Sequence, residues 1–110
     1  MIQDADRRPT GWGDPEVGAS TIDAVRKAIE RLRDVAIRTP LVPFGPPNSG
    51  ISLKSEVGQP AGSFKIRGVY NWAVGLSPDE VGRGFSTFSA GNTALALAHA
   101  AQAFGTTCRS

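Results

Sequence analysis

Lys65 lies in the segment GSFKIRG (residues 62–68), between a proline turn and a run of residues with helical spacing. A free lysine has a pKa near 10.4, so only about one in a few thousand is an uncharged nucleophile at pH 7. Burial and nearby positive charge both favour the uncharged amine, and Arg67 is two residues away. A helix N-terminus also disfavours a cation. This setting indicates an amine suited to imine formation. The alternative is a solvated lysine at the start of an amphipathic helix, and spacing alone does not separate the two.

A second segment with chemical potential is the loop Ser89-Ala90-Gly91-Asn92-Thr93. It lies between an expected strand and a helix of small residues, so its backbone N–H groups and hydroxyls can hold a carboxylate or a phosphate. Gly91 permits close approach of a ligand. The alternative is an ordinary turn in which Asn92 caps the helix.

Hydrophobic periodicity and turn residues predict the elements that position these two loops. We expect a helix, a strand, a helix, a short helix, a strand and a helix, followed by the start of another strand. Their approximate residues are 20–36, 51–56, 63–76, 77–81, 84–89, 92–104 and 106–110. Ser20 is the expected cap of the first helix, and Ser77 with Glu80 forms an expected capping box. This alternation predicts an α/β fold with parallel strand pairing.

Composition narrows the class of protein. The 110 residues carry a net charge of +2, with basic and acidic residues interleaved, which argues against a nucleic-acid partner. Cys108 is the single cysteine, so the chain has no internal disulfide, and metal-ligand spacing is absent. Residues 1–19 are polar and rich in Gly and Pro, and we expect a flexible arm without a secretory signal. No stretch has the apolar length of a membrane span, so we expect a cytoplasmic protein.

The segments LKSEVGQPAGSFKIRGVYN (residues 53–71) and FSAGNTALALAHAA (residues 88–101), preceded by RTPL, resemble the pyridoxal-phosphate-dependent threonine/serine dehydratase family. This family has fold type II, the tryptophan synthase beta-like fold. The resemblance implies a three-layer α/β fold, of which residues 20–110 would be the N-terminal portion, cut off after the first strands and helices.

The resemblance also implies roles for individual residues. Lys65 would be catalytic, binding pyridoxal 5'-phosphate covalently and moving the Cα proton of the substrate. Phe64 would pack on the pyridine ring, and Asn92 would hydrogen-bond its hydroxyl oxygen. The loop of Ser89, Ala90, Gly91, Asn92 and Thr93 would bind the substrate carboxylate. The implied reaction is β-elimination, which converts L-serine or L-threonine to a 2-keto acid and ammonia.

Two departures from the family pattern affect the expected activity. Thr93 stands where family members usually have histidine, which would retune carboxylate binding. Ala90 stands where serine-racemising members carry a second serine, so the resemblance favours elimination over racemisation. Ile66 also favours the dehydratase branch.

Family chains are several times longer, and their glycine-rich phosphate loop would lie beyond residue 110. We therefore expect the isolated chain to bind the cofactor poorly and to be inactive alone. The implied ligand is a small amino acid, with neither nucleic acid nor membrane as partner, and the full-length form could be a homo-oligomer. The alternatives are a non-catalytic interaction module and a gene remnant derived from such an enzyme.

Overall fold

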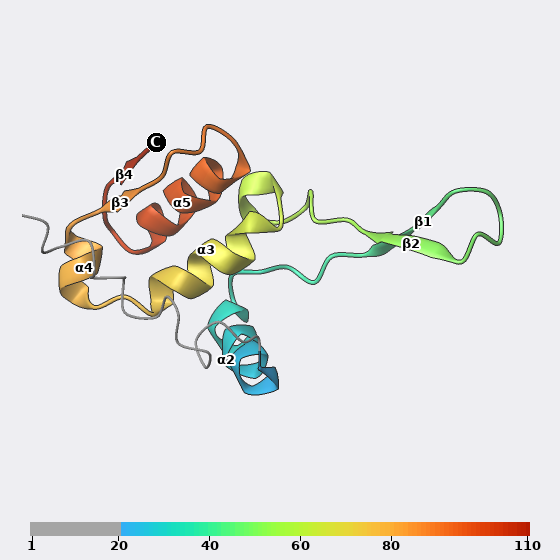
Figure 1. Cartoon of the computed structure of the whole chain (residues 1–110), viewed down its shortest axis with the longest axis horizontal. Coiled ribbons are helices and arrows are strands. Elements are labelled where there is room, and N and C mark those ends of the chain that lie inside the picture. Colours follow the sequence, from blue (N-terminus) through green and yellow to red (C-terminus); the bar gives the residue numbers. More distant parts are fainter. Residues whose placement is uncertain (1–20) are drawn as a thin grey trace, which may run out of the picture. The chain divides into compact units, whose positions relative to one another are not determined.

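The computed structural model describes residues 21–110 (Figure 1). The predicted arm, residues 1–19, and the predicted cap Ser20 lie outside the described residues. The chain divides into two compact units, residues 1–30 and residues 31–110, and each is described by itself.

The described part of the first unit, residues 21–30, forms most of helix α2 (Ile22–Leu32). Thr21 caps this helix, because its Oγ1 accepts the N–H of Ala24 at 3.1 Å. The helix is therefore confirmed, but it ends four residues before the predicted boundary at Ala36. The N–H groups of Val35 and Ala36 both donate to the carbonyl of Leu32, which turns the chain out of the helix.

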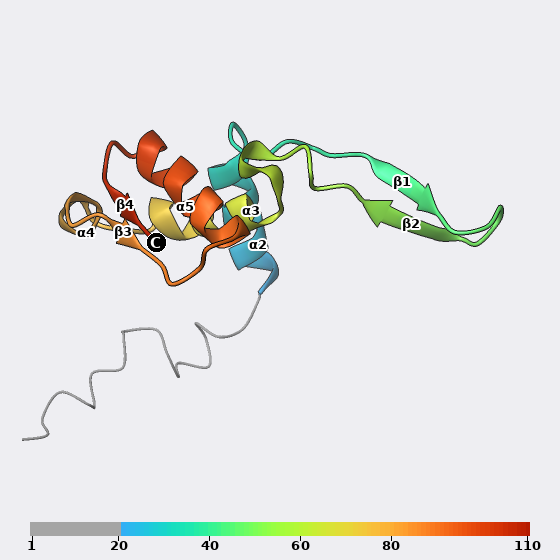
Figure 2. The same cartoon turned by 90° about the horizontal axis from the view of Figure 1, so that it is seen from above.

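The second unit opens with an antiparallel hairpin of β1 (Leu41–Phe44) and β2 (Ile51–Lys54) (Figure 2). The predicted turn over residues 45–50 is confirmed, with positive φ at Gly45 (86°), Asn48 (66°) and Gly50 (70°). Strand β1 was not predicted, and parallel pairing is wrong for this sheet. The connection of six residues explains the difference, because a parallel crossover needs a dozen or more residues.

The hairpin lies outside the core of this unit. Its register pairs Val42 with Leu53 and Phe44 with Ile51, so these four side chains share one face. Their exposed fractions range from 45% to 55%, so this apolar face remains about half accessible to solvent.

The core forms where helix α5 (Asn92–Ala103) packs on α3 (Lys65–Val74) and on the strands β3 (Phe85–Ser86) and β4 (Cys108–Arg109) (Figure 1). Its buried residues are Ala73, Phe85, Leu97, Ala100 and Ala101. The alanines of α5 let neighbouring backbones approach closely, which confirms the predicted packing of this small-residue helix. The ring of Phe85 lies 5.1 Å from that of Trp72 and 6.4 Å from that of Phe104.

Strands β3 and β4 pair in parallel, with Phe85 opposite Cys108 and Ser86 opposite Arg109. Parallel pairing is therefore confirmed for this sheet, in which α5 makes the crossover. Strand β3 is shorter than predicted. Helix α5 ends as predicted before Gly105, which has a φ of 66°.

The short helix α4 (Pro78–Gly82) begins with the predicted capping box. Ser77 Oγ accepts the N–H of Glu80 at 3.3 Å, and the N–H of Ser77 donates to Glu80 Oε2 at 2.8 Å. The prediction of an α/β fold is thus confirmed. None of the helices described between residues 21 and 110 is long and apolar enough to cross a membrane.

Candidate functional site

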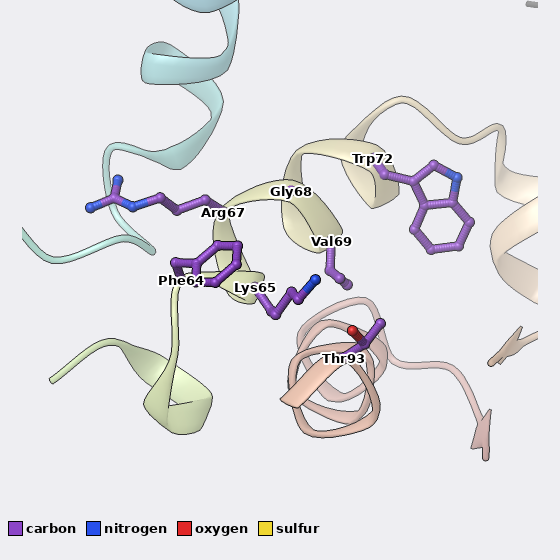
Figure 3. A pocket seen from close by; sticks show the side chains of 7 residues that line it. All are labelled: Phe64, Lys65, Arg67, Gly68, Val69, Trp72 and Thr93. Carbon is purple, nitrogen blue, oxygen red and sulfur yellow. The ribbon is translucent and has the colours of Figure 1, made fainter. Parts of the chain in front are cut away.

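An open pocket of about 440 Å³ lies at the start of α3, beside the start of α5 (Figure 3). Its lining is mostly apolar and comprises Phe64, Lys65, Arg67, Gly68, Val69, Trp72 and Thr93. Three residues of the predicted site, Phe64, Lys65 and Thr93, therefore meet at one pocket although Thr93 lies 28 positions after Lys65 in the sequence. Residues 21–110 contain no cluster of three His, Cys, Asp or Glu side chains that could hold a metal ion.

Lys65 is the first residue of α3, and its side chain extends into the pocket toward Thr93 (Figure 3). Its backbone N–H donates to Ser63 Oγ at 3.3 Å, which satisfies one of the unpaired donors of the helix start. The Nζ atom lies 5.1 Å from the centre of the Phe64 ring. No carboxylate of the described residues pairs with this amine, which is exposed and accessible to a carbonyl compound.

The loop before α5 is held in shape by its own hydroxyls. Thr87 Oγ1 accepts the N–H of Ser89, and Ser89 Oγ accepts the N–H of Gly91, both at 3.2 Å. The N–H groups of Asn92 and Thr93 have no acceptor among residues 21–110 and lie at a helix N-terminus, which attracts anions.

One expectation for this loop needs correction. Asn92 is not the cap of α5: it is already helical, and Gly91 occupies the cap position without a side-chain hydrogen bond. Ser89, Ala90, Gly91 and Asn92 directly precede Thr93 but do not line the pocket that contains Lys65.

A polar clasp, formed by Thr39, Lys54, Glu56, Gln59 and Arg67, supports the first turn of α3. Arg67 grips Glu56 with two parallel bonds, from Nε to Oε2 at 2.7 Å and from Nη2 to Oε1 at 3.2 Å. Glu56 Oε1 also accepts the hydroxyl of Thr39 at 2.5 Å. Lys54 donates to the backbone carbonyl of Thr39 at 3.1 Å. The clasp thus joins the base of the hairpin to α3.

Gln59 is the most buried polar side chain described, with an exposed fraction of 4%. Its amide binds the backbone of Ile37 in both directions: Oε1 accepts the N–H at 2.8 Å, and Nε2 donates to the carbonyl at 2.6 Å. Nε2 also reaches Glu56 Oε1 at 3.3 Å. These bonds satisfy a side chain whose burial would otherwise be costly.

The sequence interpretation of Arg67 needs correction. It placed the charge of Arg67 beside Lys65, but the guanidinium binds Glu56 and extends from α3 away from the lysine (Figure 3). The roles of Thr39, Glu56 and Gln59 were missed. Each of the three lies in a segment that resembles the family, but no local pattern indicates that their side chains converge.

The hydrogen bonds of the clasp predict that the fold loses stability as the pH falls. The hydrogen bonds that Arg67 and Thr39 donate lower the pKa of Glu56 from 4.5 to about 2. A carboxyl with a lower pKa in the folded state stabilises the fold above pH 4.5, and this contribution disappears as the pH falls toward 2. We expect the free energy of unfolding to decline over this interval and the decline to be shallower in Glu56→Gln. Urea denaturation at several pH values measures the free energy of unfolding, and Asp34→Asn, at an exposed carboxylate, is the control. Parallel pH dependence of this free energy in the wild type, Glu56→Gln and Asp34→Asn would contradict the prediction.

The chain is similar to known enzymes over most of its length. The model of the family described as "Pyridoxal-phosphate dependent enzyme" matches residues 32–110. The chain is 43% identical over 89 residues to the L-threonine ammonia-lyase of Thermotoga maritima, covering 77% of this chain and 22% of that protein. It is 36% identical over 91 residues to a serine racemase of Arabidopsis thaliana, covering 79% and 28%. It is 39% identical over 79 residues to the biosynthetic L-threonine dehydratase of Burkholderia multivorans, covering 68% and 16%.

The chain thus spans between 16% and 28% of the length of these curated relatives. The matched residues 32–110 include the clasp, Lys65 and the loop before α5. On this match, the chain belongs to the family of pyridoxal-phosphate-dependent enzymes.

Proposed function

We propose that this chain supplies the lysine and the carboxylate-binding loop for β-elimination from L-threonine or L-serine, which yields a 2-keto acid and ammonia. The observation that carries the proposal is the amine of Lys65, which has no carboxylate partner among the described residues. Its side chain extends from the start of α3 toward the start of α5 in an apolar pocket (Figure 3). The names and the identity of the relatives support the reaction class.

The described residues fit the ring and the aldehyde of pyridoxal phosphate. The pocket of about 440 Å³ is large enough for a substituted pyridine, and Phe64, Val69 and Trp72 offer apolar surface for its faces. Lys65 presents an amine for the aldehyde carbon. The other cation of the lining, Arg67, is held by Glu56, so the lining offers no free cation for the phosphate.

Each residue of the site then has a chemical task. When bound, the cofactor supplies a conjugated ring that takes up the electron pair left at Cα when the proton leaves. Lys65 holds the cofactor and then moves that proton, and Phe64 and Asn92 hold the ring in place. The loop from Ser89 to Thr93 binds the carboxylate through N–H groups at the start of α5, which orients the Cα–H bond. The proton of Cα and the hydroxyl of Cβ leave, which together amount to one water molecule. A second water molecule then hydrolyses the product to the 2-keto acid and ammonia, so the overall reaction involves no oxidation.

Ala90 favours elimination over racemisation. Racemisation needs a proton donor on the face of the substrate opposite Lys65, and a methyl group cannot supply one. The similarity to a serine racemase makes this residue the point at which the two activities can be separated.

A chimera tests the proposal. Residues 21–110 replace the matching segment of the L-threonine ammonia-lyase of Thermotoga maritima, and keto acid and D-serine are measured after addition of L-threonine or L-serine. We expect keto acid as the main product, and we expect Ala90→Ser to raise the yield of D-serine. A folded chimera that binds the cofactor but forms no keto acid would refute the proposed reaction. D-serine as the main product of the unmodified chimera would show that the chain belongs to a racemase instead.

A further inference from the structure

We propose that Arg67 is a positioning residue, which, through its grip on Glu56, fixes the rotation of the first turn of α3 and so the direction in which Lys65 enters the pocket. The inference rests on the proposed function, because it assumes that Lys65 is the reacting amine. It assigns a task to a side chain that touches neither substrate nor reacting atoms.

The geometry of the helix separates the two side chains. An α-helix has 3.6 residues per turn, so Lys65 and Arg67 point about 200° apart around the axis of α3. Figure 3 shows the lysine directed toward Thr93 and the arginine directed away from it. Arg67 therefore cannot act on the amine by direct contact, and its effect must pass through the backbone.

The residue between them completes the constraint. Ile66 is fully buried, with an exposed fraction of 0%. Ile66 is packed in the interior and Arg67 is bound to Glu56, so two of the three side chains from position 65 to position 67 are fixed. The helix therefore cannot rotate without breaking a buried contact or a charge-assisted hydrogen bond. Lys65 is left as the side chain that faces the pocket.

The loop that leads into α3 makes such a constraint necessary. Ala61 and Gly62 both have positive φ, 65° and 73°. The left-handed conformation is unfavourable for a residue with a side chain, so Ala61 adopts it only because the surrounding structure holds both ends of the loop. Gln59 anchors one end to the backbone of Ile37, and Arg67 anchors the other to Glu56.

Arginine is required at this position because the grip is bidentate. A lysine keeps the charge but presents a single ammonium group, which cannot reproduce the two parallel bonds to the carboxylate. The substitution Arg67→Lys therefore tests orientation with little change in charge, and Glu56→Gln tests the partner. Arg38→Lys is the matched control, because Arg38 is an exposed arginine of the segment that the clasp binds.

Two reagents that modify the three lysines of the chain distinguish the orientation of each amine from its exposure to solvent. Pyridoxal phosphate condenses with an uncharged amine with loss of water, and borohydride then fixes the adduct by adding hydride; this reaction depends on how the amine faces the pocket. Acetic anhydride transfers an acetyl group to any accessible uncharged amine. Timed reactions of the whole chain, followed by peptide mass spectrometry, give the ratio of the two rates at each lysine.

In both clasp variants we expect this ratio to fall by about 10–100-fold at Lys65, because a displacement near 1 Å is costly to an oriented reaction. The ratio at Lys27 and the ratio at Lys65 in Arg38→Lys should not change. An unchanged ratio at Lys65 in both folded variants would overturn the inference alone. Loss of helical circular dichroism in both variants would also overturn it, because the clasp would then serve only stability. A wild-type chain in which pyridoxal phosphate shows no preference for Lys65 over Lys27 would also overturn the inference, whereas the proposed function is tested separately by the chimera.

Discussion

A Lys65→Ala variant is expected to abolish the preferential reaction of the chain with pyridoxal phosphate and, in the chimera, to lower the rate of keto acid formation by about 10²–10⁴-fold or more. The physical reason is that one amine performs two tasks, since it holds the cofactor and then moves the Cα proton. The amine is accessible and has no carboxylate partner among the described residues, so its removal leaves the surrounding hydrogen bonds intact.

Lys27→Ala is the matched control for this experiment. Lys27 is also exposed, but it lies on α2 and belongs neither to the pocket lining nor to the clasp. Its loss should leave Lys65 as the labelled residue. Equal residual rates in the two variants would show that Lys65 is an ordinary surface lysine.

A Phe85→Ala variant is expected to lose about 3–5 kcal/mol of the free energy of unfolding. Phe85 is only 3% exposed and contacts Trp72 and Phe104, and it also begins the parallel pair with Cys108. Its removal would leave a cavity between α3, α5 and β3 that the rigid alanine packing of α5 cannot fill. Because a unit of this size is stable by only about 5–10 kcal/mol, the loss should be visible as a large shift in the urea midpoint.

Phe88→Ala provides the control with the same chemical change. The Phe88 side chain is fully exposed, three positions after Phe85. Its removal should change the free energy of unfolding by no more than about 0.5 kcal/mol. Similar losses in the two variants would mean that Phe85 is not part of the core.

Much of the fold followed from local patterns. The capping box of Ser77 and Glu80, the turn over residues 45–50 and the end of α5 before Gly105 all depend on bonds or dihedral angles within a few residues. Such features are encoded where they occur, so they can be predicted from residue types alone. The antiparallel pairing of β1 with β2 could also have been predicted, from the shortness of its connection.

The sequence by itself determined that Lys65 begins a helix and that a small-residue helix follows the loop of residues 89–93. Only the tertiary structure decided that Lys65 faces Thr93 and that Arg67 turns away to bind Glu56. The reason is the range of the interactions. Thr39, Glu56, Gln59 and Arg67 are separated by turns whose paths no local pattern specifies, and a carboxylate finds its partner only after the chain has folded around it.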